Sequence, residues 1–103
     1  MEKRRPHHSL DAIKADLARL LQMSTTARTS ALALGFDEAG VRVVVASASR
    51  LMFYKSMTSY ADSQEWQDVY HVPATSPVKG AVVLYVKFTR MADGHWVLSF
   101  KEK

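Results

Sequence analysis

The chain has 103 residues, no cysteine, and a formal net charge of +4, from 14 Lys and Arg against 10 Asp and Glu. Its length fits one domain over residues 1–103, and the lack of cysteine excludes disulfides, thiolate metal sites and thiol catalysis. No apolar run approaches the roughly 20 residues of a membrane helix and no secretory signal is present, so we expect a soluble cytoplasmic protein with no membrane partner. Its positive charge favours phosphate-rich or acidic partners.

Two helices are predicted in the first third of the chain. Ser9 is a suitable N-cap for the first, whose apolar positions fall on one stripe: Leu10, Ile13, Leu17, Leu20 and Leu21. The second covers residues 27–34 and is entered from Thr25 or Thr26. It ends at Gly35, because glycine readily takes the left-handed conformation that follows a helix.

The middle of the chain is less decisive. Residues 41–46 contain four valines, which favour a strand, although their spacing also fits a buried helix, and both readings stay open. A short helix capped by Ser47 or Ser49 is then predicted through Leu51, Met52, Tyr54 and Lys55. A polar, turn-prone segment follows over residues 58–63. Residues 66–72 alternate as a strand with one wet face, and residues 73–80 are typical of a loop.

The last quarter of the chain predicts a β-hairpin, because apolar and polar residues alternate on both sides of a turn. A two-residue turn at Asp93 and Gly94 would set Val86 opposite Lys101 and mix the two faces. A three-residue loop, residues 92–94 with Gly94 left-handed, keeps the faces separate. The core side then pairs Val86 with Phe100 and Phe88 with Leu98, and the other side pairs Tyr85 with Lys101 and Lys87 with Ser99.

This hairpin carries cations and a phenol on one surface. Ammonium groups neutralise phosphate oxygens and a phenol donates or relays a proton, which are the needs of RNA cleavage by a ribose 2′-hydroxyl. No His, Asp or Glu spacing suits a metal, so no metal site and no cofactor are predicted. The alternative reading is that strand lysines only keep a sheet face soluble.

Other side chains are weaker candidates. His7 and His8 lie in an N-terminal arm as surface groups or phosphate contacts, whereas the isolated His71 and His95 are predicted to be structural. Four aromatic residues either stack on RNA bases or pack in the core: Phe53, Tyr54, Trp66 and Tyr70. Asp62 and Asp68 either orient a lysine, accept from a base edge, or are simply solvated.

Three blocks of the sequence carry a resemblance to a known family. They are Phe53-Tyr54-Lys55-Ser56-Met57-Thr58 with Tyr60 and Asp62, then Trp66-Gln67-Asp68-Val69-Tyr70, then Ser99-Phe100-Lys101-Glu102-Lys103. With the opening Met1-Glu2-Lys3 and Pro6-His7, they resemble the motility quorum-sensing regulator (MqsR) toxin family. The order of the predicted elements already indicates an α+β fold, with N-terminal helices packed on a small, mainly antiparallel sheet that ends in the C-terminal hairpin. The resemblance implies that this fold is RelE-like. It also implies that residues 41–46 are helical or part of a helical connection.

The resemblance further implies the toxin of a type II toxin–antitoxin system, inhibited by an MqsA-like antitoxin. Such a toxin is an mRNA endoribonuclease that cuts at short GC-containing sequences without a required metal. The implied catalytic residues are Lys55, Gln67, Tyr85 and Lys101, and the expected RNA-binding residues are Lys87, Lys103, His7, Tyr54 and Trp66. Two alternatives stay open: cleavage only on the ribosome, and a basic RNA- or antitoxin-binding module that lacks catalysis.

Overall fold

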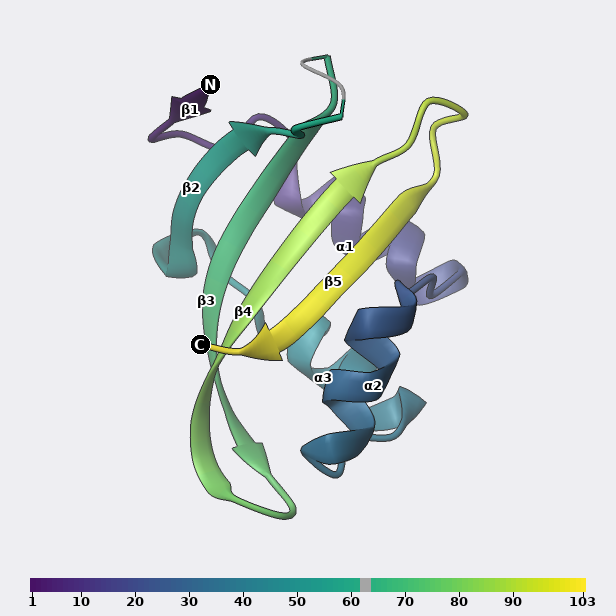
Figure 1. The fold of residues 1–103 in the computed structure, drawn as a ribbon, viewed down its shortest axis with the longest axis vertical. Helices are drawn as coiled ribbons and strands as arrows, with labels where there is room; N and C mark the ends of the chain where they lie inside the picture. The colour runs from purple at the N-terminus through teal and green to yellow at the C-terminus, as the bar shows by residue number, and fades with distance from the viewer. Residues whose placement is uncertain (62–63) are drawn as a thin grey trace.

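A computed structural model describes residues 1–61 and 64–103, so Asp62 lies outside the described residues. Over these residues the helical elements are α1 (Leu10–Arg19), α2 (Thr25–Ala33), α3 (Glu38–Ser47) and the short 3₁₀ helix η1 (Arg50–Met52). The strands are β1 (Glu2–Lys3), β2 (Phe53–Thr58), β3 (Trp66–Ser76), β4 (Gly80–Arg90) and β5 (Trp96–Glu102). They form one antiparallel sheet in the order β1-β2-β3-β4-β5. Helices α1 and α3 lie behind this sheet, and α2 lies alongside the edge strand β5 (Figure 1). The predicted α+β class is confirmed.

Helix α1 begins as predicted and ends earlier than predicted. The Ser9 hydroxyl accepts a hydrogen bond from the Ala12 amide at 3.3 Å, which satisfies one free N–H of the first turn. Leu10, Ile13 and Leu17 are buried on the predicted stripe. Leu20 does not continue it, because the helix ends at Arg19 and the Leu20 side chain is 60% exposed.

Helix α2 is capped by Ser24, one residue before the predicted entry. The Ser24 hydroxyl accepts from the Ala27 amide at 3.1 Å. The end is as predicted, since Gly35 follows the helix with a φ of +82°. The small side chains of Ala27 and Ala31 are buried and let the helix approach β5 closely.

The valine-rich segment is helical, which resolves the open choice for residues 41–46. Asp37 caps α3 by accepting from the Gly40 amide at 2.7 Å. Val41, Val44 and Val45 are buried, whereas Val43 is 68% exposed. A strand would bury alternate residues, so this burial at i, i+3 and i+4 has the helical period.

Two sequence predictions in the middle of the chain were wrong. Only Arg50–Met52 form a short helix, whereas Tyr54 and Lys55 lie on β2. The predicted loop over residues 73–80 is instead mostly strand, because β3 pairs with β4 as far as Ser76 opposite Gly80. Pro73 is tolerated in β3 because no described strand pairs with the other side of β3 at this point: β2 starts at Phe53, opposite Tyr70. A proline, which has no N–H, is acceptable at such a free edge. The resulting long hairpin extends beyond the rest of the sheet (Figure 1).

The C-terminal hairpin has the predicted register. Val86 pairs with Phe100, and Tyr85 pairs with Lys101. The Met91 amide donates to the His95 carbonyl at 2.8 Å, which closes the three-residue loop over residues 92–94. Gly94 has a φ of +92°, so it takes the left-handed conformation expected at this position.

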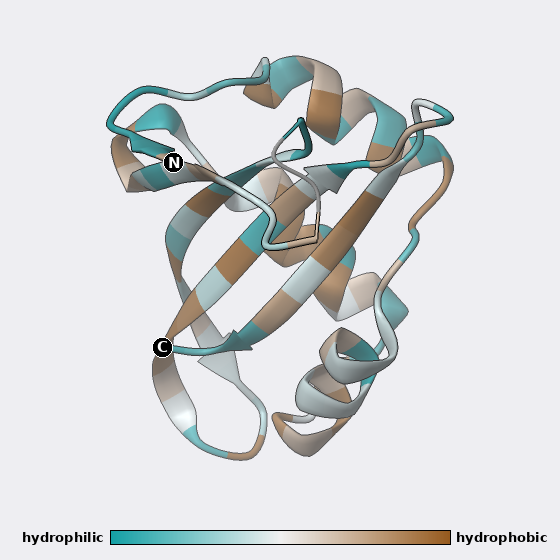
Figure 2. Cartoon of the chain, turned by 45° about the horizontal axis from the view of Figure 1, so that its top comes forward, coloured by the Kyte–Doolittle hydropathy of each residue, from teal (hydrophilic) through white to brown (hydrophobic). Residues whose placement is uncertain are grey.

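The core lies between the helices and one face of the sheet. Hydrophobic and hydrophilic residues alternate along β4 and β5 (Figure 2), and the apolar set faces the helices. Phe88, Leu98 and Ile13 are fully buried there. Among the described residues, no helix has the length and apolar character needed to cross a membrane.

Tyr70 brings a polar hydroxyl into this core. Its ring is fully buried, so it cannot stack on an RNA base, which corrects one of the alternatives drawn from the sequence. Its hydroxyl has no hydrogen-bond partner among the described residues, and burial raises the pKa of Tyr70 to about 12. Because an unsatisfied buried hydroxyl costs about 1–3 kcal/mol, we expect Tyr70→Phe to raise the free energy of unfolding by roughly 1 kcal/mol in urea denaturation. Equal or lower stability of the variant would show that the hydroxyl is satisfied.

Candidate functional site

The sheet surface turned away from the helices, here called the outer face, carries all four predicted catalytic positions. Strand register defines it, because paired residues of neighbouring strands point to the same side. Its cross-strand rows are Met57–Gln67–Thr89–Val97, then Lys55–Val69–Lys87–Ser99, then His71–Tyr85–Lys101. Lys55 and Lys101 therefore stand on β2 and β5, about three strand spacings of roughly 4.8 Å apart.

A shallow hollow of about 420 Å³ lies on the β4–β5 side of this face. Tyr85, Lys87 and Lys101 line it from the sheet, and the start of α2 lines it from the other side through Ser24 and Thr26. The hollow thus combines two ammonium groups, a phenol and hydroxyl groups. This donor set is suited to an anion such as a phosphodiester.

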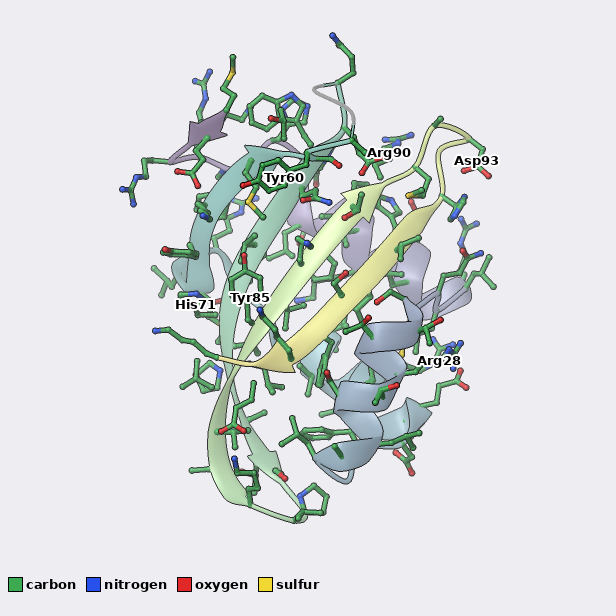
Figure 3. The ribbon with its side chains drawn as sticks, in the orientation of Figure 1. Arg28, Tyr60, His71, Tyr85, Arg90 and Asp93 are labelled. Carbon is green, nitrogen blue, oxygen red and sulfur yellow. The ribbon has the colours of Figure 1, made fainter. Side chains whose placement is uncertain are left out.

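Three rings form a continuous row across the outer face, here called the aromatic row: Tyr54, His71 and Tyr85. Tyr54 and His71 are stacked with ring centroids 4.2 Å apart, and His71 and Tyr85 follow at 5.9 Å. A bulge in β2 between Phe53 and Lys55 lets Tyr54 join this face beside Lys55. Figure 3 shows His71 and Tyr85 side by side on neighbouring strands.

An ammonium group stands at each end of the aromatic row. The Lys55 Nζ lies 5.4 Å from the Tyr54 ring centroid, and the Lys101 Nζ lies 5.2 Å from the Tyr85 centroid. Both distances are within the range of cation–π attraction, which holds the cations close to the rings. The predicted neighbours Tyr85 and Lys101 are therefore in contact as well as in register.

Charged neighbours set the protonation of this face. Lys55 donates to Glu2 at 2.6 Å, and this hydrogen bond raises the pKa of Lys55 and lowers the pKa of Glu2. Burial, and next the charge of Lys101, lower the pKa of Lys87, while Glu65 opposes the shift. Burial and the nearby Lys103 also lower the pKa of His71.

The predicted RNA-binding residues divide into two groups. Lys87 and Tyr54 lie on the outer face, and Lys103 lies close enough to act on His71 electrostatically. His7 and Trp66 lie elsewhere. Their rings stack on each other at 4.8 Å with an interplanar angle of 11°, and Trp66 shares the helix-facing side of β3 with Asp68.

Asp68 has a structural role that the sequence alternatives did not include. Its carboxylate is fully buried and accepts hydrogen bonds from the Ser56 hydroxyl at 2.6 Å, the His8 amide at 2.8 Å and the His7 amide at 3.2 Å. It orients no lysine and is not solvated. Asp68 therefore fixes the N-terminal arm to β2 and β3.

His71 is the outer-face residue that sequence reasoning missed. The sequence predicts an isolated structural histidine, whereas His71 pairs with Tyr85 at the centre of the aromatic row. The position of His71 could have been predicted only by recognising that β3 continues beyond residue 72 and still pairs with β4 there. That continuation is hidden because residues 73–80, which include Pro73 and Gly80, have the composition of a loop.

Metal-ligating side chains do not gather in the part of the chain that the structure describes: no group of three or more His, Asp or Glu was found there. The positive charge of the outer face comes instead from Lys55, Lys87 and Lys101. Because these ammonium groups are already in place, the face can neutralise a phosphate with its own side chains.

Comparisons with known proteins agree with this architecture. The family model described as the motility quorum-sensing regulator, toxin of MqsA, matches residues 5–102. The mRNA interferase toxin MqsR of Escherichia coli (strain K12) is 43% identical over 105 residues, and the alignment covers 100% of both chains. Both matches span the helices and every strand from β2 to β5. The chain therefore belongs to the motility quorum-sensing regulator family of toxins.

Proposed function

We propose that the outer face is an RNA-cleaving centre that works without a required metal ion. The chain is a toxin of the mRNA interferase class, an endoribonuclease. The observation that best supports this location is the contact between Lys101 and Tyr85 in the hollow that Lys87 also lines. A cation, a phenol and a second cation there surround a space suited to one phosphate group.

The chemistry requires stabilisation of added negative charge. Attack of a ribose 2′-hydroxyl on the adjacent phosphorus gives a pentacovalent species with more charge on its oxygens than the starting diester. In this proposal Lys55 and Lys101 neutralise that charge from the two ends of the aromatic row. Tyr85 protonates the leaving oxygen, and Gln67, two cross-strand rows from Tyr85, orients the substrate through its side-chain amide.

The partners follow from the same proposal. The substrate is mRNA, cut at short GC-containing sequences in the cytoplasm, with inhibition of translation as the result. The inhibitor is an MqsA-like antitoxin, in keeping with the family's description as the toxin of MqsA. The net charge of +4 favours both an RNA and an acidic protein surface through long-range attraction.

Cleavage of naked RNA in the presence of EDTA tests the proposal. The purified chain is incubated with a synthetic RNA that contains GC sequences, without ribosomes, and the products are mapped. We expect the same cleavage sites and rates with and without EDTA. Loss of cleavage with EDTA would overturn the metal-free mechanism, and cleavage only after ribosomes are added would favour the ribosome-dependent alternative. Lys101→Ala purified in parallel identifies any contaminating nuclease.

A further inference from the structure

The aromatic row places His71 between the groups that the proposed function uses. His71 lies on β3, half-buried, with Tyr54 stacked on one side and Tyr85 on the other. Lys55 and Lys101 stand beyond these two rings. The imidazole therefore occupies the middle of the proposed site, between its two cations.

The proposed function leaves one chemical requirement without a residue. Attack by the 2′-hydroxyl needs a group that accepts its proton. Lysine and tyrosine side chains ordinarily have pKa values near 10 and act near neutral pH as cations or proton donors, which are the roles given above to Lys55, Lys101 and Tyr85. Gln67 has no proton to exchange. The outer face therefore needs a base that these four residues do not provide.

Three described residues on or close to the outer face can in principle accept a proton: His71, Glu2 and Lys87. Burial lowers the pKa of Lys87, but an amine starts from an ordinary value of 10.5, far above that of an imidazole, and Glu65 opposes the shift. Glu2 is bound to Lys55 at 2.6 Å, and that hydrogen bond lowers the pKa of Glu2 and makes it a weaker base. Glu65 lies beyond the row, before the first residue of β3. An imidazole ordinarily has a pKa near neutrality, and no cation among the described residues is hydrogen-bonded to His71, which leaves His71 as the better acceptor.

We propose that His71 is the general base of RNA cleavage, an inference that rests on the proposed function of the outer face. Its unprotonated ring nitrogen accepts the 2′-hydroxyl proton as the 2′-oxygen forms a bond to phosphorus. The bond from phosphorus to the 5′-oxygen breaks with its electron pair on that oxygen, which receives a proton from the Tyr85 hydroxyl. The products are a 2′,3′-cyclic phosphate and a 5′-hydroxyl. One proton then passes from His71 to Tyr85 through water and restores both groups.

The surroundings of His71 favour its unprotonated form. Tyr54 faces it from β2, Tyr85 faces it from β4, and the charge of Lys103 reaches it from the C-terminus. Burial, and next the charge of Lys103, lower the pKa of His71 below its ordinary value of 6.5. At pH 7 the ring is then mostly unprotonated. Cleavage should level off towards neutral pH and should fall as the pH drops through the lowered pKa of His71, because protonated imidazole cannot accept the proton.

A pH–rate profile of matched variants tests this role. Single-turnover cleavage of a GC-containing RNA is measured from pH 4.5 to 8 for the parent, His71→Gln and His95→Gln. His95 is the control because it is paired with Asp93 in the β4–β5 loop region, and Figure 3 shows Asp93 far from His71 and Tyr85. We expect His71→Gln to be about 100- to 10,000-fold slower and to lose the acidic limb of the profile. His95→Gln should keep the rate and the limb.

Two further variants separate catalysis by His71 from a structural role and from catalysis by Glu2. His71→Ala should regain part of its activity when free imidazole is added, whereas a residue with only a structural role would not respond. Glu2→Gln should retain the acidic limb. If His71→Gln keeps the parental rate and limb, or if the limb is lost only in Glu2→Gln, His71 is not the base.

Failure of the proposed function gives a different pattern from failure of this inference. If the parent cuts RNA neither alone nor with ribosomes, or if Lys101→Ala cuts it at the parental rate, the outer face is not the cleaving centre and the role of His71 is overturned with it. If the parent cuts and Lys101→Ala does not, a fully active His71→Gln overturns the base assignment alone. Thermal melting of each variant confirms that it is folded.

Discussion

Lys101→Ala is expected to lower kcat/KM for cleavage of a GC-containing RNA by about 100- to 1,000-fold. The Lys101 ammonium lies 5.2 Å from the centroid of the Tyr85 ring and lines the hollow that we assign to the phosphate. Its charge acts mainly on the pentacovalent state, where the oxygens carry more charge than in the diester. The loss should therefore appear in kcat more than in KM, as measured by steady-state kinetics.

Tyr85→Phe examines the same site without disturbing its packing. The substitution removes the hydroxyl and keeps the ring that contacts His71 and Lys101. We expect a loss of about 100-fold or more if the hydroxyl protonates the leaving oxygen. Lys79→Ala is the control for both substitutions, because Lys79 is an exposed lysine in the turn between β3 and β4. Its ammonium group pairs with Glu102 at 2.6 Å. Parental rates in both Lys101→Ala and Tyr85→Phe would refute the assignment of the outer face.

Asp68→Ala is expected to have the largest effect on stability among single substitutions of polar residues. The buried carboxylate accepts from Ser56 and from the amides of His7 and His8, and each of these donors would lose its partner inside the protein. Hydrogen bonds to a charged group contribute about 1.5–3 kcal/mol each and are not additive, so we expect a loss of roughly 3 kcal/mol. In a domain of this size this lowers Tm by roughly 10–20 °C.

The measurement for Asp68→Ala is urea denaturation, together with limited proteolysis of the N-terminal arm. The arm should be cut faster, because Asp68 holds the segment that connects β1 to α1. Asp11→Ala is the matched control: it removes an exposed carboxylate from the first turn of α1 and should change stability by less than about 0.5 kcal/mol. An Asp68→Ala variant as stable as Asp11→Ala would contradict the role given to Asp68.

Elements governed by local hydrogen bonding followed directly from the sequence. Ser9 and the stripe of Leu10, Ile13 and Leu17 are enough to predict α1, because a cap and a helical period involve residues only three or four positions apart. The short loop at Gly94 likewise fixed the register of the final hairpin. The contact between Tyr85 and Lys101 was therefore predictable without any knowledge of the family.

Two candidate catalytic residues, Lys55 and Gln67, could be predicted from the sequence only through its resemblance to the family. Lys55 was predicted on a helix and lies on a strand, yet its place in the Phe-Tyr-Lys block identified it as a candidate catalytic residue. Gln67 joined the set in the same way. The local sequence pattern did not predict that Lys55 and Gln67 share a face of the sheet. Their relative position depends on the register of β2 against β3, and the length of the segment that connects these strands does not fix that register.

The sequence by itself determined the α+β class, the first helix, the final hairpin and one cation–phenol pair on that hairpin. Only the tertiary structure decided that His71 joins this pair, that the valine-rich segment forms α3, and that Asp68 binds the N-terminal arm. The physical reason is the separation in sequence between the residues whose interactions determine each feature. Caps and tight turns depend on neighbouring residues, whereas strand pairing and burial depend on residues that only folding brings together.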